Sequence, residues 1–190
     1  FPGGPDEIRS RDLTASIRIR DPFATPAFDG TANIGGVRMA AGTVESIDLG
    51  LAGTLERFDW TVSAAGKFTT LVAMSASGSV FLADPAMTVL VDKLEGDAGG
   101  YPFALLAPAK FTLQEDTFRT GPVALSFDSG RVDLQASLLP QSIEASANLE
   151  NIPAAITSLF QPRADLDGTF SGSLSAQGSR QHPLLSLVVK

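Results

Sequence analysis

The sequence predicts an all-β fold: an elongated, curved sheet with one short helix near residues 152–160. Apolar and polar residues alternate through most of the chain, and alternating side chains point to opposite faces of a β-strand. Turn-forming residues such as Gly99-Gly100 separate the alternating runs. The resulting strands, about a dozen, recur at the spacing of ~8–12 residues that is typical of all-β proteins.

The alternating segments follow one another along the whole chain, each with one apolar and one polar face. They are 13–20, 47–51, 58–64, 68–76, 87–91, 123–127, 132–138, 143–149 and 166–176. The run Asp128-Ser129-Gly130, between Phe127 and Val132, predicts a tight hairpin. Further turns are predicted at Asp29-Gly30, Gly35-Gly36, Glu95-Gly96-Asp97 and Gly99-Gly100.

One segment has helical rather than strand spacing. Apolar residues stand at positions 152, 155, 156, 159 and 160, which is the i, i+3, i+4 pattern of an amphipathic helix. Asn151 is the candidate N-cap, Pro153 suits the first turn, and Pro162 prevents continuation. The segment predicts a short helix that lies across the sheet or over one end of it.

The domain organisation predicted from these patterns is simple. Residues 1–12 form an irregular lead-in, and residues 13–190 form a single β-segment of a longer, repeat-like array. Phe28-Asp29-Gly30-Thr31 is echoed by Leu166-Asp167-Gly168-Thr169, which favours similar strand-turn units that need neighbours to bury their faces. The chain starts at Phe1 without Met, so it is expected to be a fragment or a processed product.

The composition excludes several classes of protein. Hydrophobic residues are 44% and charged residues 18% of the 190 positions, unlike a disordered acidic tail. The net charge of −7 and the lack of Lys/Arg clusters argue against nucleic-acid binding. The longest uncharged run, 68–83, is too short and too polar to span a bilayer. Without cysteine there is no disulfide, thiolate nucleophile or Cys-based metal site.

No catalytic constellation accompanies the strands, so the chain is not expected to be an enzyme or to hold a cofactor or metal. The one histidine, His182, lies in a predicted turn. Asp165-Leu166-Asp167-Gly168 lacks the ligand positions of a calcium loop. The densest acidic cluster is Asp92, Glu95 and Asp97, which predicts a solvated turn rather than a carboxylate pair for glycoside chemistry.

Two stretches resemble the translocation and assembly module TamB family, within the AsmA-like superfamily. The first is the run 147–160 followed by Ala164–Gly178 and Pro183-Leu184-Leu185: a short helix, a Gly-punctuated strand, a proline and another strand. The second is 101–111 with its sequel 123–134. The resemblance spans most of 13–190, on degenerate motifs of Gly, Pro and alternation.

The resemblance implies a β-taco, a sheet folded into a half-pipe with an apolar interior. It implies a periplasmic protein, anchored in the inner membrane in its full-length form. Its expected function is that of a bridge section whose groove carries phospholipid between inner and outer membrane, assists outer-membrane protein assembly, or both. The expected partners are phospholipid acyl chains and an outer-membrane barrel protein, the latter through regions outside this fragment.

Within each run the apolar residues occupy alternate positions and therefore share one face of the strand. These residues are expected to face inward and line the lipid groove. They are Trp60, Val62, Val72, Met74, Val89, Val91, Val123, Leu125, Phe127, Val132, Leu134, Leu166, Phe170 and Leu174.

Alternative interpretations stay open at this point. The apolar strand faces also fit an ordinary β-sandwich core, in which two sheets cover each other, or a β-solenoid. An assembly module would instead pair its sheet edge with unfolded strands of outer-membrane proteins. A β-solenoid enzyme acting on polysaccharide would depend on Asp92, Glu95 and Asp97.

Overall fold

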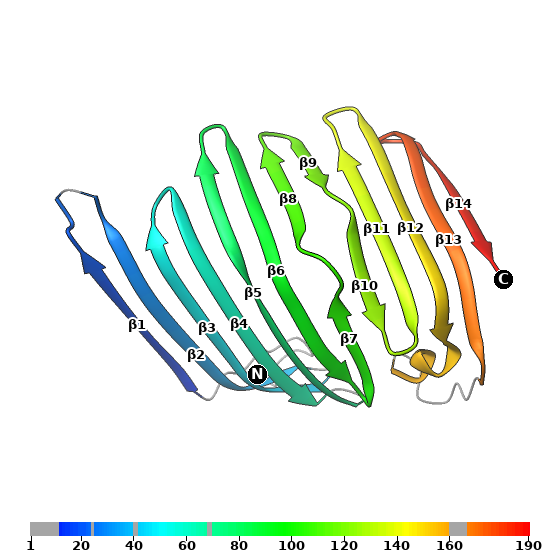
Figure 1. Ribbon diagram of the computed structural model, residues 1–190, viewed down its shortest axis with the longest axis horizontal. Coiled ribbons are helices and arrows are strands. Elements are labelled where there is room, and N and C mark those ends of the chain that lie inside the picture. Colours follow the sequence, from blue (N-terminus) through cyan, green and yellow to red (C-terminus); the bar gives the residue numbers. More distant parts are fainter. Residues whose placement is uncertain (1–11, 24, 40–41, 68–69, 160–166) are drawn as a thin grey trace, which may run out of the picture.

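The computed structural model describes residues 12–23, 25–39, 42–67, 70–159 and 167–190. Most of these residues belong to one antiparallel sheet of 14 strands, which confirms the all-β prediction (Figure 1). The strands are β1 (Asp12–Arg20), β2 (Ala27–Met39), β3 (Gly42–Thr54), β4 (Arg57–Lys67), β5 (Leu71–Ala83), β6 (Ala86–Ala98), β7 (Tyr101–Leu105), β8 (Ala109–Gln114), β9 (Thr117–Thr120), β10 (Val123–Phe127), β11 (Gly130–Leu138), β12 (Ser142–Pro153), β13 (Thr169–Ser179) and β14 (Pro183–Val189).

The strands follow each other through the sheet as a meander. Each strand from β1 to β6 pairs with the next one, and so does each from β10 to β13. The centre is more complex, because β6 pairs with β7 near one end and with β8 near the other. β8 and β9 therefore form a hairpin beside the β7–β10 pair, and β11 receives β10 and β9 on one edge (Figure 1).

Two of the predicted turns are confirmed. Phe127 pairs with Gly130, so Asp128 and Ser129 form a two-residue hairpin loop, with Asp128 at φ 51°. Gly99 and Gly100 connect β6 to β7 at φ 67° and 90°, a left-handed conformation that glycine adopts without steric cost.

Three other predicted turns are wrong, because their glycines lie inside strands. Asp29-Gly30 and Gly35-Gly36 belong to β2, and Glu95-Gly96-Asp97 belongs to β6. Gly30 pairs with Ile17 and Leu51 on the neighbouring strands. A glycine within a strand often marks close approach by a neighbouring group, and it looks like a turn signal when the sequence is read alone.

The predicted helix exists in a shorter form. A 3-10 helix, η1 (Ala154–Leu159), follows β12, whereas Ile152 and Pro153 belong to the strand. The N-cap prediction for Asn151 is wrong: this residue has φ 52° and lies at an irregularity of β12 between Leu149 and Ile152. The strand extends this far because Ile152, only 3% exposed, pairs with Phe170.

The predicted lead-in falls almost wholly outside the described residues, which start at Asp12, the first residue of β1. The predicted strand 166–176 corresponds to β13, which begins at Thr169, and Leu166 lies outside the described residues. The predicted strand 68–76 corresponds to β5, which begins at Leu71.

The structure buries little for a chain of this size. The accessible surface is 12746 Å², against about 8,600 Å² for a compact protein of the same mass. Among the described residues no large side chain is fully buried, and Ala76, Val80, Ala109, Val123 and Ile152 are the buried hydrophobic ones. The described residues therefore form one sheet without a second layer, whereas stable domains bury each sheet face against another element.

Candidate functional site

The strand register assigns every paired residue to one of two faces, because directly opposed residues of antiparallel strands lie on the same side. Trp60 of β4 pairs with Leu51 of β3 and Gly78 of β5. The row continues to Gly30 on one side and to Val91 on the other. The other rows on the same side of the sheet contain the residues two, four or more positions away along each strand. We call this side the apolar face.

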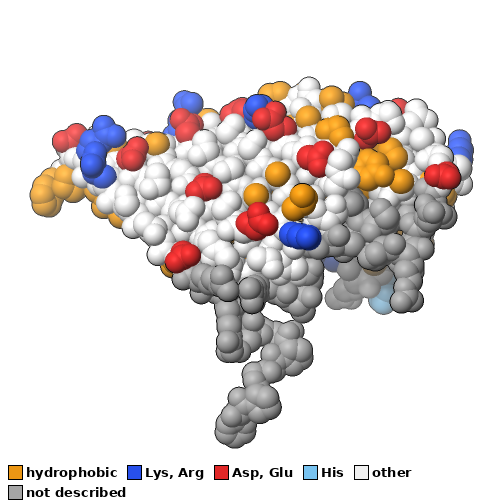
Figure 2. Space-filling view, turned by 90° about the horizontal axis from the view of Figure 1, so that it is seen from below, with side chains coloured by type: hydrophobic (Ala, Val, Ile, Leu, Met, Phe, Trp, Pro, Cys, Tyr) orange, Lys and Arg blue, Asp and Glu red, His pale blue; other side chains and the backbone are white. Residues whose placement is uncertain are grey.

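The apolar face crosses all 14 strands. No Asp, Glu, Lys or Arg occupies one of its paired positions among the described residues. At the paired positions of the described strands, its polar side-chain groups are the hydroxyls of Thr120 and Tyr101 and the indole N–H of Trp60. Charged side chains lie on the opposite, polar face and in the turns, and Figure 2 shows them along the whole upper margin of the molecule.

Irregularities in three strands keep the apolar face continuous where the alternation changes phase. Val91 and Leu94 both belong to this face although they are three residues apart, and the register shifts between them. The same holds for Leu149 and Ile152 on β12. A third shift adds Glu45 to β3. A β-bulge inserts one residue, so each shift restores the apolar parity beyond it.

The hydroxyl of Thr120 is engaged by the backbone. Its oxygen accepts a hydrogen bond from the N–H of Ala136 at 2.8 Å. Ala136 lies where the partner of β11 changes, because β10 pairs as far as Leu134 and β9 pairs from Ser137. The hydroxyl of Thr120 thus takes the place of a backbone acceptor where the ladder is interrupted. The N–H of Ala136 keeps a hydrogen-bond partner within the sheet.

Aromatic rings lie over glycines of neighbouring strands on this face. A Cβ at Gly78 would come within 3.0 Å of the Trp60 ring, and one at Gly96 would collide with the Phe103 ring. The Phe103 and Phe127 rings stack at 6.3 Å with 5° between their planes. The indole nitrogen of Trp60 is buried and has no hydrogen-bond partner.

Large side chains of the apolar face are exposed even in the interior of the sheet. Leu49 is 39% exposed, Leu134 38% and Leu174 45%, and the exposed fraction rises to 71% at Ile17 on the edge strand β1. Twelve strands at ~4.8 Å by ~30 Å of strand length give an area of about 1,700 Å². Soluble monomers seldom expose contiguous apolar patches beyond ~300–600 Å².

The apolar face is hollowed between β8 and β14. A cavity of about 380 Å³ is lined by several alanines and by larger apolar side chains. Its lining includes Phe111, Leu134, Ala145, Leu174 and Leu185.

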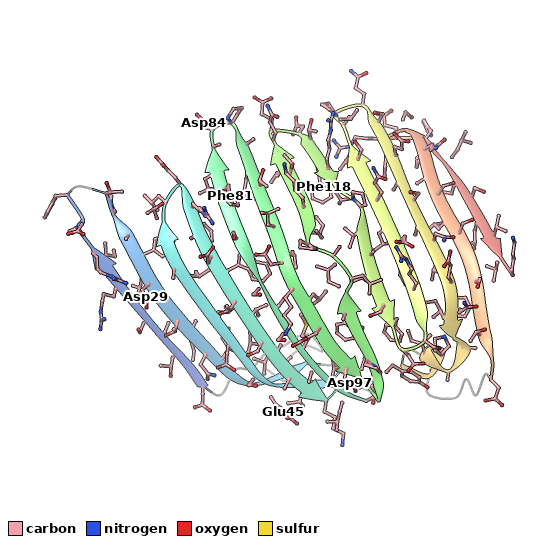
Figure 3. All side chains as sticks on the ribbon, viewed as in Figure 1. Asp29, Glu45, Phe81, Asp84, Asp97 and Phe118 are labelled. Carbon is pink, nitrogen blue, oxygen red and sulfur yellow. The ribbon has the colours of Figure 1, made fainter. Side chains whose placement is uncertain are left out.

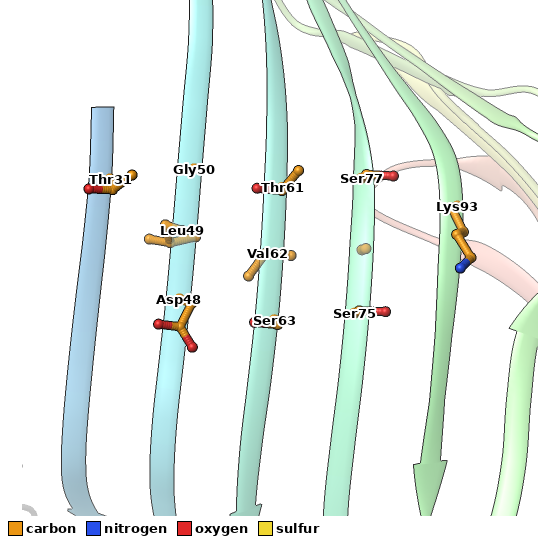
Figure 4. A pocket seen from close by; sticks show the side chains of 11 residues that line it. Thr31, Asp48, Leu49, Gly50, Thr61, Val62, Ser63, Ser75, Ser77 and Lys93 are labelled. Atoms are coloured by element: carbon orange, nitrogen blue, oxygen red, sulfur yellow. The ribbon is translucent and has the colours of Figure 1, made fainter. Parts of the chain in front are cut away.

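The polar face also has shallow hollows, but their lining is different. One of about 410 Å³ lies over β2 to β6 and presents Asp48, Thr61, Ser75 and Lys93 (Figure 4). Its charged groups are partnered locally: Asn33 Nδ2 donates to Asp48 Oδ1 at 2.6 Å, and Lys93 Nζ lies 2.7 Å from Glu95 Oε1. The stick view shows such side chains distributed over the whole sheet rather than gathered at one site (Figure 3).

Two ion pairs on the polar face shift the pKa of Glu95, Arg131 and Asp133. The hydrogen bond from Lys93 lowers the pKa of Glu95 below its ordinary value of 4.5. Arg131 donates two hydrogen bonds to Asp133, at 2.7 and 2.8 Å. These bonds lower the pKa of Asp133 and raise that of Arg131. All four side chains are well exposed, so these pairs are features of a solvated surface.

Thirteen of the fourteen residues predicted to face inward lie on the apolar face, and Leu166 lies outside the described residues. The register connects them from Trp60 and Val62 through Val89 and Val132 to Phe170 and Leu174. Their contact with lipid stays a prediction. Thr120 and Tyr101 also belong to this face and were missed. So were the alternate residues of the edge strands, such as Ile17 of β1 and Leu185 of β14, although β1 alternates clearly.

The acidic cluster is not a turn, as the sequence suggested, but part of β6. Asp92 is the extra residue at the register shift, Glu95 pairs with Lys93, and Asp97 Oδ1 accepts a hydrogen bond from the N–H of Gly100 at 2.8 Å. No metal-binding group of three or more His, Cys, Asp or Glu occurs among the described residues. His182 lies in the predicted turn, where its backbone N–H donates to Ser179 Oγ at 3.1 Å.

Comparison with known proteins gives no relative: no protein-family model, curated protein or solved structure matches the chain. Within the described part of the chain, no helix has the length and hydrophobicity needed to cross a bilayer.

Proposed function

We propose that this chain is a section of a periplasmic bridge whose apolar face carries phospholipid between the inner and outer membranes. The observation that supports the proposal is the apolar face itself, which crosses 14 strands without a charged residue at a paired position of the described chain. Such a surface needs a cover, because apolar area in contact with water is unfavourable.

Acyl chains fit the dimensions of this surface. The face is about 55 Å long across the strands and about 30 Å wide along them. An acyl chain reaches across half of the ~30 Å hydrocarbon core of a bilayer, so one chain fits within the width of the face. Each methylene removed from water contributes about 0.8 kcal/mol. Tails can therefore be held without any specific polar contact.

The sheet is proposed to curve towards its apolar face and form a half-pipe. Glycines and alanines are frequent on this face, and the small groups leave room on the inner side of a curved sheet. Trp60 over Gly78 and Phe103 over Gly96 illustrate how aromatic rings occupy the space of a missing side chain. In such a half-pipe the tails lie inside while the headgroup stays at the open mouth, in water.

The role proposed here is one of carriage rather than catalysis. Charged groups on the polar face are paired with one another or dispersed, as Lys93–Glu95 and Arg131–Asp133 illustrate. The sequence also resembles the TamB family, and the lipid transport that this resemblance implies agrees with the proposed role. A closed sandwich would bury its large inner side chains, whereas Leu134 and Leu174 are 38% and 45% exposed.

A matched pair of variants tests the proposal. Leu134→Asp places a carboxylate at the cavity of the apolar face, and Thr112→Asp places one on the polar face, opposite Arg119 of β9. The chain is purified from cells and its bound phospholipid is extracted and measured by mass spectrometry. We expect lipid with the wild type and with Thr112→Asp, and little with Leu134→Asp, because a carboxylate against hydrocarbon is unfavourable.

Urea unfolding of the same proteins separates lipid binding from folding. Retained stability with lost lipid in Leu134→Asp supports the proposal. Absence of phospholipid from the wild type, or equal amounts in both variants, contradicts it. Collapse of the fold in Leu134→Asp alone indicates a closed apolar core, since unpaired charge in a core costs several kcal/mol.

A further inference from the structure

The cavity of the apolar face lies in the interior of the sheet. Its volume of about 380 Å³ falls within the range of ~300–1,000 Å³ that is usual for small-molecule sites. Its lining includes residues of β11, β12 and β13, and each of these strands pairs with a neighbour on both sides. The cavity therefore does not depend on either edge of the sheet.

The register gives the cavity a direction. Ala136 pairs with Ala145, and Ala145 pairs with Ala176, so the three alanines form one row across β11, β12 and β13. Thr120 continues the row on β9, where its side-chain oxygen accepts the hydrogen bond from the N–H of Ala136. The row runs across the strands rather than along them. We call the space over this row the transverse slot.

Larger apolar side chains lie at both ends of the transverse slot and on both of its sides. They are Phe111 and Leu185 at the ends of the row, Leu134 and Leu174 in the row on one side, and Leu138 and Ile143 in the row on the other. The flanking rows are two residues away along each strand, or about 6.7 Å. The slot thus has the width of one row of large side chains, which the alanines leave unfilled.

These dimensions fit one linear acyl chain. From Thr120 to Ala176 the slot crosses three strand spacings of ~4.8 Å, or about 14 Å. A chain that reaches the middle of a bilayer core spans about 15 Å, half of ~30 Å. An acyl chain is a single file of methylenes, so it is about as wide as one extended aliphatic side chain. Among the described residues that line the cavity none is charged, and the oxygen of Thr120 already has a partner.

We propose that the transverse slot is a discrete binding site for one linear acyl chain, which lies across the strands along the long axis of the sheet. The proposal rests on the proposed function, because it names the position and the chain shape that the apolar face selects. Leu134 and Leu174, now 38% and 45% exposed, flank the chain and are covered by it. The headgroup and any second chain of the lipid stay outside the slot.

Filling the slot tests the proposal. Ala145→Leu and Ala176→Leu each place a large side chain in the row, and neither changes the charge. Ala32→Leu is the control, because it adds the same side chain to the apolar face on β2, between Ala15 and Leu49. The probe is cis-parinaric acid, a linear fatty acid whose fluorescence rises when its chain leaves water. It is titrated into protein that has been freed of co-purified lipid.

The wild type and Ala32→Leu should show a single saturable site for the probe. Ala145→Leu and Ala176→Leu should weaken this site by about tenfold or more, because displacing two methylenes from an apolar contact is sufficient for that loss. Urea unfolding identifies a filled variant that does not fold, and the second filled variant then decides. Equal affinity in the filled variants and in Ala32→Leu overturns the proposal, and so does a wild type without a saturable site.

Competition on the wild type tests the width of the slot without any substitution. Palmitate is a linear acid, and phytanate has a main chain of the same length that carries methyl branches. We expect palmitate to displace the probe and phytanate to be about tenfold less effective, because an extra methyl group is rejected by a fitted apolar site. Equal displacement by the two acids overturns the proposal, whether or not the filled variants fold.

Phospholipid extracted from the same proteins separates this proposal from the proposed function. If the wild type holds phospholipid and the filled variants bind the probe as Ala32→Leu does, the discrete site is wrong and the carriage of lipid stands. If the wild type holds no phospholipid and only the filled variants lose the probe site, the proposed function is wrong and the acyl-chain site stands.

Discussion

The side-chain oxygen of Thr120 accepts a hydrogen bond from the backbone N–H of Ala136 at 2.8 Å. The bond lies where β11 exchanges one neighbouring strand for another, and it occupies a polar side chain on the apolar face. Thr120 thus bridges the gap between the β10 and β9 pairings of β11, and its hydroxyl is used within the sheet.

Thr120→Val is predicted to destabilise the fold. Valine keeps the shape but removes the acceptor, and a partly buried N–H without a partner costs about 1–3 kcal/mol. The measurement is the free energy of urea unfolding. Thr112→Val on β8 is the control, because it lies on the polar face, and it should change stability by less than about 0.5 kcal/mol. Equal losses in both variants would argue against a special role for Thr120.

Gly78→Ala is predicted to destabilise more than Gly30→Ala, although both glycines lie on the apolar face. A Cβ at Gly78 collides with the carbonyl of Leu90 and approaches the Trp60 ring to 3.0 Å, whereas one at Gly30 finds ordinary contacts at 3.5 Å or more. Overpacking costs about 1–3 kcal/mol. Alanine at position 30 restricts the unfolded chain more than glycine does. Gly30→Ala should therefore leave the free energy of unfolding unchanged or raise it by about 0.4–1 kcal/mol. Urea unfolding of the two variants tests the difference.

Acid should weaken the contribution of Asp133 to stability. Its pKa is lowered in the folded state by the hydrogen bonds from Arg131, from an ordinary value of 3.8. A carboxyl with a depressed folded pKa contributes stability above its unfolded pKa and loses it as the pH falls through the folded value. Arg131→Gln should therefore raise the Asp133 pKa towards 3.8. Carboxyl-carbon NMR titration measures this, and an unchanged midpoint would show that the ion pair is not populated in solution.

Alternation in the sequence was sufficient to predict the class of fold and the shared face of thirteen residues. It succeeded because the side-chain period of a strand does not depend on the partners. The register shifts were also visible as apolar spacings of three, at Val91–Leu94 and Leu149–Ile152. Gly30 and Gly96 could not be distinguished from turn residues, because the groups that lie against these glycines belong to neighbouring strands. The same is true of Thr120, whose partner Ala136 is fixed only by the order of β9, β10 and β11.

Trp60 provides the most direct test of the claim that the apolar face holds acyl chains. It is the only tryptophan, and it lies on this face over Gly78. The measurement is tryptophan emission of the chain loaded with phospholipid whose tails carry bromine, compared with the same lipid without bromine. The control moves the tryptophan to the polar face with Trp60→Phe and Phe81→Trp. We expect brominated tails to quench Trp60 strongly and to leave the tryptophan at position 81 bright. Equal emission of Trp60 with both lipids, while lipid is bound, would show that the apolar face does not hold the tails.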